Sequence, residues 1–234
     1  MNESTETTAV TVIDPARKQL ARSIYESPKR YAHICNVGVA FAKSTLVPKE
    51  FKNNPANCTI AVSLALRLGV DPLTLMQNLS IVNGKPGIDA KLLIALINDS
   101  GLFTGPLEFE VVGSDPRKPD YKVRAFARFK ATGQVVYGPW IDWQMVKGEG
   151  WLDKSGSKWK TMPELMFTYR AATFFSRVHC PQVSLTGMYT ADEIEDFSDG
   201  VAVVDYPQDL PRLDVTPEQS QTPKTEPIDG VDNF

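Results

Sequence analysis

Residues 121–130 alternate between two kinds of side chain, and successive side chains of a β-strand point to opposite faces. One face would carry apolar residues suited to a core: Val123, Ala125, Ala127 and Phe129. The other would carry four cations around one ring: Lys122, Arg124, Phe126, Arg128 and Lys130. Cations pair with phosphates and a ring stacks on a base, so this second face favours nucleic-acid binding. The alternative is the solvated polar face of an ordinary amphipathic strand.

A predicted helix over 161–178 carries a second group of cations. Consecutive residues lie 100° apart on a helix, which places four side chains on one stripe: Met166, Arg170, Thr173 and Arg177. Two guanidinium groups one heptad apart can hold successive phosphates. Just upstream, three lysines interleave with two indole rings: Lys154, Lys158, Lys160, Trp151 and Trp159. Structural salt bridges and solvated lysines are the competing interpretation.

The sequence offers little for catalysis or metal binding. Residues 83–87, Asn-Gly-Lys-Pro-Gly, lack the length and the terminal Ser or Thr of a nucleotide-binding phosphate loop. No GxSxG or HExxH motif occurs, and His33 and His179 stand outside any motif. A zinc site or a disulfide framework would need more than three widely spaced cysteines, Cys35, Cys58 and Cys180. We therefore predict a protein that is not an enzyme and has no metal or other cofactor.

Charge is divided unevenly along the 234 residues. Residues 1–189 hold 23 Lys and Arg against 16 Asp and Glu, a net +7, whereas residues 190–234 hold 2 against 12, a net −10. A basic body indicates a polyanionic partner, and the acidic tail either solubilises the protein or competes for the same surface. There is no run of eighteen apolar residues, and the first residues are acidic and polar, so we expect a cytoplasmic protein.

The elements that must position these side chains predict an α+β fold, in which a small antiparallel β-sheet or hairpin packs with several helices. We expect helices over 16–42 (broken at Pro28), 55–68, 89–99 and 161–178, and strands over 79–82, 107–112, 121–130 and 134–137. They would form one domain for DNA binding and oligomerisation, 16–197. A disordered N-terminus, 1–15, would precede it and a disordered acidic tail, 198–234, would follow.

Local signals refine these boundaries. Gly69, with Asp71-Pro72 just beyond, is expected to end the helix 55–68, and residues 83–87 are expected to form a turn. The capping-box sequence Thr161-Met162-Pro163-Glu164 is expected to begin the last main helix, after an irregular region over 140–160. A second capping box at Thr190 predicts a short helix.

Two stretches carry further motifs in a fixed order. The first is Leu68-Gly69-Val70-Asp71-Pro72-Leu73-Thr74, followed by Gly87-Ile88-Asp89. The second runs from Trp159-Lys160-Thr161-Met162-Pro163 to Arg177 and continues as Gly187-Met188-Tyr189-Thr190-Ala191-Asp192-Glu193. Their order and spacing resemble those of phage single-strand DNA-annealing recombinases of the RecT and Red-beta family, over about residues 55–197. Glu164 departs from the pattern, because a basic residue follows the proline in Red-beta.

The resemblance implies annealing of complementary single strands without ATP, in phage-type homologous recombination and DNA repair, by an oligomeric ring or filament. It also implies a phage or prophage origin and a partner 5′–3′ exonuclease that resects duplex ends. By motif match, Arg170 and Arg177 would contact the DNA backbone. We expect cations of the sheet and of the last main helix to converge in one basic groove, which holds the phosphates and leaves the base edges accessible.

Two functions besides annealing are compatible with the sequence. A metal-dependent phage nuclease is the main alternative, and a phage structural or adaptor protein is the second. The acidic tail ends in Phe234 and is similar to the partner-docking tip of bacterial single-strand-binding proteins. It would serve as a solvating tail, as a shield over the basic groove, or as a dock for a host repair protein; a host single-strand-binding protein is a further candidate partner.

Overall fold

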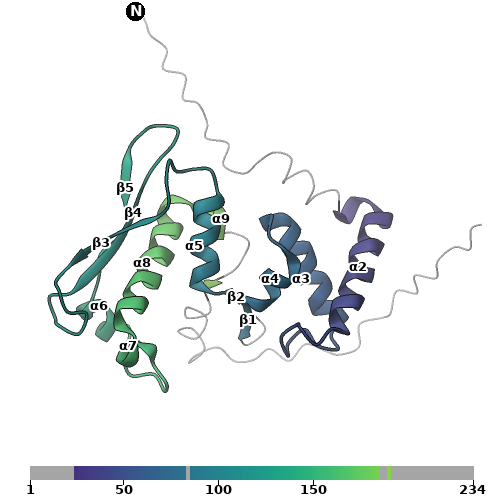
Figure 1. Ribbon diagram of the computed structural model, residues 1–234, viewed down its shortest axis with the longest axis horizontal. Helices are drawn as coiled ribbons and strands as arrows, with labels where there is room; N and C mark the ends of the chain where they lie inside the picture. Colours follow the sequence, from purple (N-terminus) through teal and green to yellow (C-terminus); the bar gives the residue numbers. More distant parts are fainter. Residues whose placement is uncertain (1–23, 83–84, 185–188, 191–234) are drawn as a thin grey trace, which may run out of the picture. The chain divides into compact units, whose positions relative to one another are not determined.

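The computed structural model describes residues 24–82, 85–184 and 189–190. The helices are α2 (Pro28–Ala42), α3 (Pro55–Leu68), α4 (Pro72–Gln77), α5 (Ala90–Asp99), α6 (Trp143–Gly148), α7 (Lys158–Thr161), α8 (Pro163–His179) and α9 (Pro181–Ser184). The strands are β1 (Leu79–Val82), β2 (Lys85–Ile88), β3 (Glu108–Val112), β4 (Lys122–Arg128), β5 (Val135–Tyr137), β6 (Ile141–Asp142) and β7 (Tyr189–Thr190). The chain thus has a mixed α/β fold with small, mainly antiparallel sheets and several helices (Figure 1). No helix in this described part is long and apolar enough to span a bilayer.

Three helices begin in the same way, with a proline directly after a polar N-cap residue. Ser27, Asn54 and Asp71 precede α2, α3 and α4, and each side-chain oxygen accepts a hydrogen bond from the backbone N–H three residues on. Proline is tolerated there because the first helical residue has no intrahelical acceptor for its N–H. Gly69 ends α3 in the left-handed conformation (φ 70°), as predicted. We expected Asp71-Pro72 only to follow the end of α3, but these two residues also begin α4.

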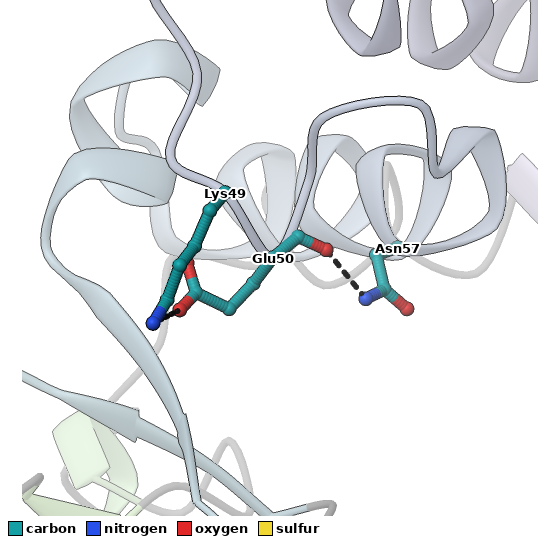
Figure 2. Close-up of polar contacts among 3 residues, drawn as sticks. All are labelled: Lys49, Glu50 and Asn57. Atoms are coloured by element: carbon teal, nitrogen blue, oxygen red, sulfur yellow. Dashed lines mark hydrogen bonds and ion pairs between the residues drawn. The ribbon is translucent and has the colours of Figure 1, made fainter.

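Hydrogen bonds tie the α2–α3 connection to the start of α3. The side-chain amide of Asn57 donates to the backbone carbonyl of Glu50 over 2.9 Å, and the two groups face each other in Figure 2. The buried Cys58 thiol donates to the carbonyl of Phe51, whose ring lies in the core. The Lys49–Glu50 ion pair beside them, 3.8 Å long, leaves the lysine almost fully exposed and contributes little stability.

The larger sheet is built around β4. Strands β3 and β5 flank it and β6 pairs with its first residues, all antiparallel. Along β4 the side chains alternate as predicted, because Val123, Ala125 and Ala127 are buried while the residues between them are not. Helix α8 packs along this buried inner face (Figure 1), where the ring of Tyr121 lies 5.2 Å from that of Phe167. The opposite, outer face of β4 carries Lys122, Arg124, Phe126 and Arg128.

The smaller sheet differs from the prediction. Residues 85–88 form β2 and pair antiparallel with β1, where we expected part of the turn 83–87. Strand β2 also pairs in parallel with β7, so Thr190, the first residue of the expected short helix, has the extended backbone that an N-cap residue also adopts. The other residues of that expected helix lie outside the described residues. The same holds for four other predicted segments: the N-terminus 1–15, residues 16–23 of the first helix, residues 83–84 of the turn and the tail 198–234.

Two further predictions are wrong: the irregular region over 140–160 and the capping box at Thr161. Residues 140–160 contain β6, α6 and most of α7. Helix α8 begins at Pro163, and Met162 at its N-cap makes no side-chain cap bond. Thr161 cannot act as the N-cap because it is the last residue of α7, and an N-cap residue needs an extended backbone. Its hydroxyl donates instead to the carbonyl of Lys158.

Helix α2 approaches α3 closely at Gly38. A methyl group added there would lie 2.4 Å from the Thr59 Oγ1 atom and 2.9 Å from the Thr59 backbone nitrogen. We expect Gly38→Ala to lower the free energy of unfolding by about 1–3 kcal/mol, because overpacking outweighs the gain of about 1 kcal/mol in helix propensity. Thermal unfolding followed by circular dichroism measures the change. Gly148→Ala, in a helix with open space around it, is the control; equal effects of the two substitutions would contradict the close contact.

Candidate functional site

The outer face of β4 gathers residues from three other segments. In the antiparallel register Glu110 of β3 lies opposite Arg124, and Tyr137 of β5 lies opposite Phe126. Paired residues point to the same face, so these side chains meet on the outer face. Trp140, between β5 and β6, completes the group. We call this set the outer-face cluster: Glu110, Lys122, Arg124, Phe126, Tyr137 and Trp140.

Arg124 is the centre of the outer-face cluster. Its guanidinium carbon lies 4.1 Å from the ring centroid of Tyr137 and 4.5 Å from that of Trp140. Its Nε donates to Glu110 Oε2 over 2.7 Å, and its Nη2 lies 2.7 Å from the same oxygen. The guanidinium therefore makes cation–π contacts with two rings and an ion pair through its Nε–Nη2 edge.

The rings extend this arrangement on both sides of Arg124. The Phe126 and Tyr137 rings stack with centroids 5.6 Å apart and planes 29° apart. The Lys122 Nζ lies 4.7 Å from the Trp140 ring centroid. Tyr137 is the most open of the rings, with 46% of its surface exposed. The cluster thus presents an accessible aromatic face bordered by cations.

The charge of the outer face is more balanced than β4 alone suggests. Register places Glu108 opposite Phe126 and Asp142 opposite Lys122, in addition to Glu110 opposite Arg124. The strand itself carries no acid, but its neighbours bring three carboxylates to the same face. Phosphate attraction is therefore weaker here than the sequence of β4 implies, and ring stacking gains in relative importance.

The two predicted cations at the far end of the strand remain accessible. Arg128 and Lys130 are both solvent-facing, at the hairpin that joins β4 to β5. The Arg128 Nη1 donates to the backbone carbonyl of Gly133 over 2.6 Å, which holds its guanidinium across the turn. These two side chains extend the outer face with net positive charge.

Arg170, predicted as a DNA contact, is buried. Only 4% of its surface is exposed, and its guanidinium carbon lies 4.1 Å from the ring centroid of Trp151. Trp151 in turn stacks on Trp159 (5.6 Å, 18°), and Trp159 meets Phe167 edge to face at 5.0 Å. Arg170 therefore belongs to an aromatic cluster that packs residues 151–159 onto α8. The prediction that Arg170 contacts a phosphate directly is therefore wrong, because its side chain is buried.

The other predicted cations lie on the surface. Arg177 is exposed near the end of α8, with its guanidinium carbon 6.0 Å from the Phe174 ring centroid. Lys158 and Lys160 are exposed on α7, while Trp159 between them is buried. The alternation of lysines and indoles thus arises from a short helix that buries Trp159 in the core and exposes the lysines on either side.

One prediction about the whole site is wrong. We expected sheet cations and α8 arginines to converge in one groove. Helix α8 packs against the inner face of β4, whereas Lys122, Arg124 and Arg128 lie on the outer face. The two sets are therefore separated by the sheet itself, and of the two it is the outer-face cluster that combines cations with accessible rings.

Three members of the outer-face cluster do not follow from the sequence pattern. Tyr137 and Glu110 lie in predicted strands, but their face depends on the register with β4, which the pattern does not give. Trp140 lies in the region expected to be irregular. Tyr137 could have been assigned to the outer face from the sequence only by assuming a β4–β5 hairpin register that pairs it with Phe126.

The cysteines lie apart from this cluster. Cys58 and Cys180 are buried and Cys35 is half-buried, all as free thiols. Burial raises the pKa of the Cys180 thiol to about 12, so it stays protonated and unreactive in the folded protein. Within the described ranges, no group of three or more His, Cys, Asp or Glu side chains is placed to hold a metal ion.

Comparisons with protein families, with curated proteins and with solved structures found no match for this chain. The resemblance to the RecT and Red-beta family therefore stays a prediction.

The burial of Arg170 has a measurable consequence. We expect Arg170→Ala to lower the free energy of unfolding by about 2–4 kcal/mol, because it removes the contact with Trp151 and leaves a cavity. Arg177→Ala, on the exposed side of the same helix, should change it by less than about 0.5 kcal/mol. Denaturant unfolding followed by tryptophan fluorescence measures both. If Arg170→Ala is as stable as the parent, Arg170 is not a structural part of the aromatic cluster.

Proposed function

We propose that this protein binds single-stranded DNA and anneals complementary strands without a nucleotide cofactor. The observation that carries the proposal is the outer-face cluster, where the exposed ring of Tyr137 contacts Phe126 and Arg124, and Arg124 in turn contacts Trp140. Base–aromatic stacking contributes about 1–3 kcal/mol per base and tolerates any sequence, because every base has a π-face. Such a surface suits a DNA strand whose base edges must stay available for pairing with a complementary strand.

Cations near the cluster supply the remaining contacts. Arg128 and Lys130 lie at the hairpin end of the same face, away from the acids that neutralise its centre. Phosphates of a strand stacked on Tyr137 would meet them next. The free energy of annealing comes from Watson–Crick pairing between the strands, so the protein needs no fuel and only has to hold the first strand with its base edges exposed.

The family resemblance adds the finer parts of the proposal. It supports an annealing-recombinase core, assembly as a ring or filament, and action in the bacterial cytoplasm beside a 5′–3′ exonuclease and a single-strand-binding protein. Neighbouring subunits would then share one strand, which makes binding cooperative. Arg177 would not touch DNA bound at the same subunit's outer face, because α8 and the cluster lie on opposite sides of the sheet. Lys158 and Lys160 would not touch it either, because α7 packs on α8.

An annealing assay tests the proposal. Two complementary labelled oligonucleotides are mixed with the protein, without ATP and with magnesium, across a salt series. We expect duplex formation well above the spontaneous rate and strands of unchanged length. Shortened strands would instead indicate a metal-dependent nuclease, and no effect on annealing or binding would overturn the proposal.

Tyr137 provides the test of the site. We expect Tyr137→Ala to weaken binding to single-stranded DNA by about 1–3 kcal/mol, or roughly 5- to 150-fold in Kd, through loss of base stacking. Fluorescence anisotropy with a labelled oligonucleotide measures the change. Tyr31→Ala is the matched control, since Tyr31 is also 46% exposed but lies on α2. If the two variants bind equally well, the outer-face cluster is not the DNA site.

A further inference from the structure

Glu110 occupies the position at which a phosphate would meet Arg124. One carboxylate oxygen lies 2.7 Å from both Nε and Nη2 of the guanidinium. These two donors form one edge of the planar group, the edge that takes a phosphate or carboxylate oxygen in charge-assisted pairing. The side chains are 26% exposed for Arg124 and 40% exposed for Glu110, so the pair is reachable by a macromolecular ligand.

The rings prevent Arg124 from turning to another anion without loss. Its guanidinium carbon lies 4.1 Å from the ring centroid of Tyr137 and 4.5 Å from that of Trp140, so a rotation away from Glu110 would lose these cation–π contacts. A guanidinium held in this way keeps its charge beside Glu110 and links the rings of Tyr137 and Trp140. The pair therefore converts a cation that could bind any phosphate into part of a stacking platform.

This conversion matters for the choice between single strands and duplexes. Both forms of DNA present phosphates, but only a single strand presents unstacked bases to aromatic rings. A cation that is free to pair with phosphates would strengthen binding to both forms, whereas the rings act on the single strand alone. Neutralising Arg124 therefore raises the preference for single strands even though it lowers the total attraction.

We propose that Glu110 is a specificity-determining residue, which neutralises Arg124 and thereby makes the outer-face cluster select unpaired bases over duplex phosphates. The inference rests on the proposed function and assigns within it a role to an acid at the centre of a basic strand. It explains why the outer face keeps a carboxylate directly opposite Arg124 in a protein body of net positive charge.

The test compares Glu110→Gln with Glu108→Gln. Both substitutions remove one negative charge from the same strand and the same face, but Glu108 lies opposite Phe126 and not opposite a cation. Kd values are measured at low salt for a labelled oligothymidine and for a duplex of equal length. We expect Glu110→Gln to tighten duplex binding by about three- to tenfold, as one cation is released for a phosphate, and to tighten single-strand binding less. Glu108→Gln should change both affinities slightly and by the same factor.

The gain must depend on Arg124. In the double variant Glu110→Gln with Arg124→Gln, we expect duplex affinity to return to that of the parent or below it. Thermal unfolding of all variants confirms that the fold is kept. A single-strand to duplex ratio that is the same in Glu110→Gln and Glu108→Gln, or a gain that persists without Arg124, would overturn the role of Glu110.

These results are separable from those that bear on the proposed function. If the parent protein binds and anneals single strands and Tyr137→Ala impairs binding, but Glu110→Gln leaves the ratio unchanged, only the role of Glu110 fails. If the parent protein does not bind single strands at all, the proposed function fails, and the inference drawn from it fails with it.

Discussion

The close packing of α8 on the inner face of β4 is the constraint on which the candidate site depends. Ala125 and Ala127 are small enough for the helix to lie near the backbone of the strand, and both are buried. Gly138 belongs to the same contact, since a methyl group there would lie 3.2 Å from Phe175 Cβ. With one face of the sheet closed by α8, every polar side chain of β4 must lie on the other face. The outer-face cluster is thus a consequence of how the core closes.

Period-two alternation allowed one half of this arrangement to be predicted from the sequence. The pattern of residues 121–130 depends only on neighbours along the chain, and the structure confirms the buried set of Val123, Ala125 and Ala127. The same local reasoning found β3 and β5. It failed for Arg170, because helical periodicity gives the direction of a side chain but not the segment that covers it. Residues 151–159 return to cover that stripe through Trp151, a contact between positions far apart in sequence.

The remaining half of the site depends on strand register, which local patterns do not determine. The cross-strand neighbours of β4 include three acids, so a strand with four cations in or beside it lies on a face with nearly balanced charge. A charge count along one strand therefore overestimates the field at the surface. The same register brings Tyr137 beside Phe126, which increases the aromatic area. The strand register thus weakens the attraction of this face for phosphates and increases its capacity for aromatic stacking.

A balance of this kind has a consequence for annealing under the proposed function. A surface that held DNA mainly by its phosphates would hold the duplex product at least as well as the single strand, because pairing removes no phosphates. Aromatic rings behave differently, since bases that pair also stack on one another within the duplex and leave the rings. The free energy of pairing is then released while the contact with the protein weakens. A nearly neutral row of rings, with cations such as Arg128 at its border, can therefore bind the substrate and release the product without any nucleotide-driven step.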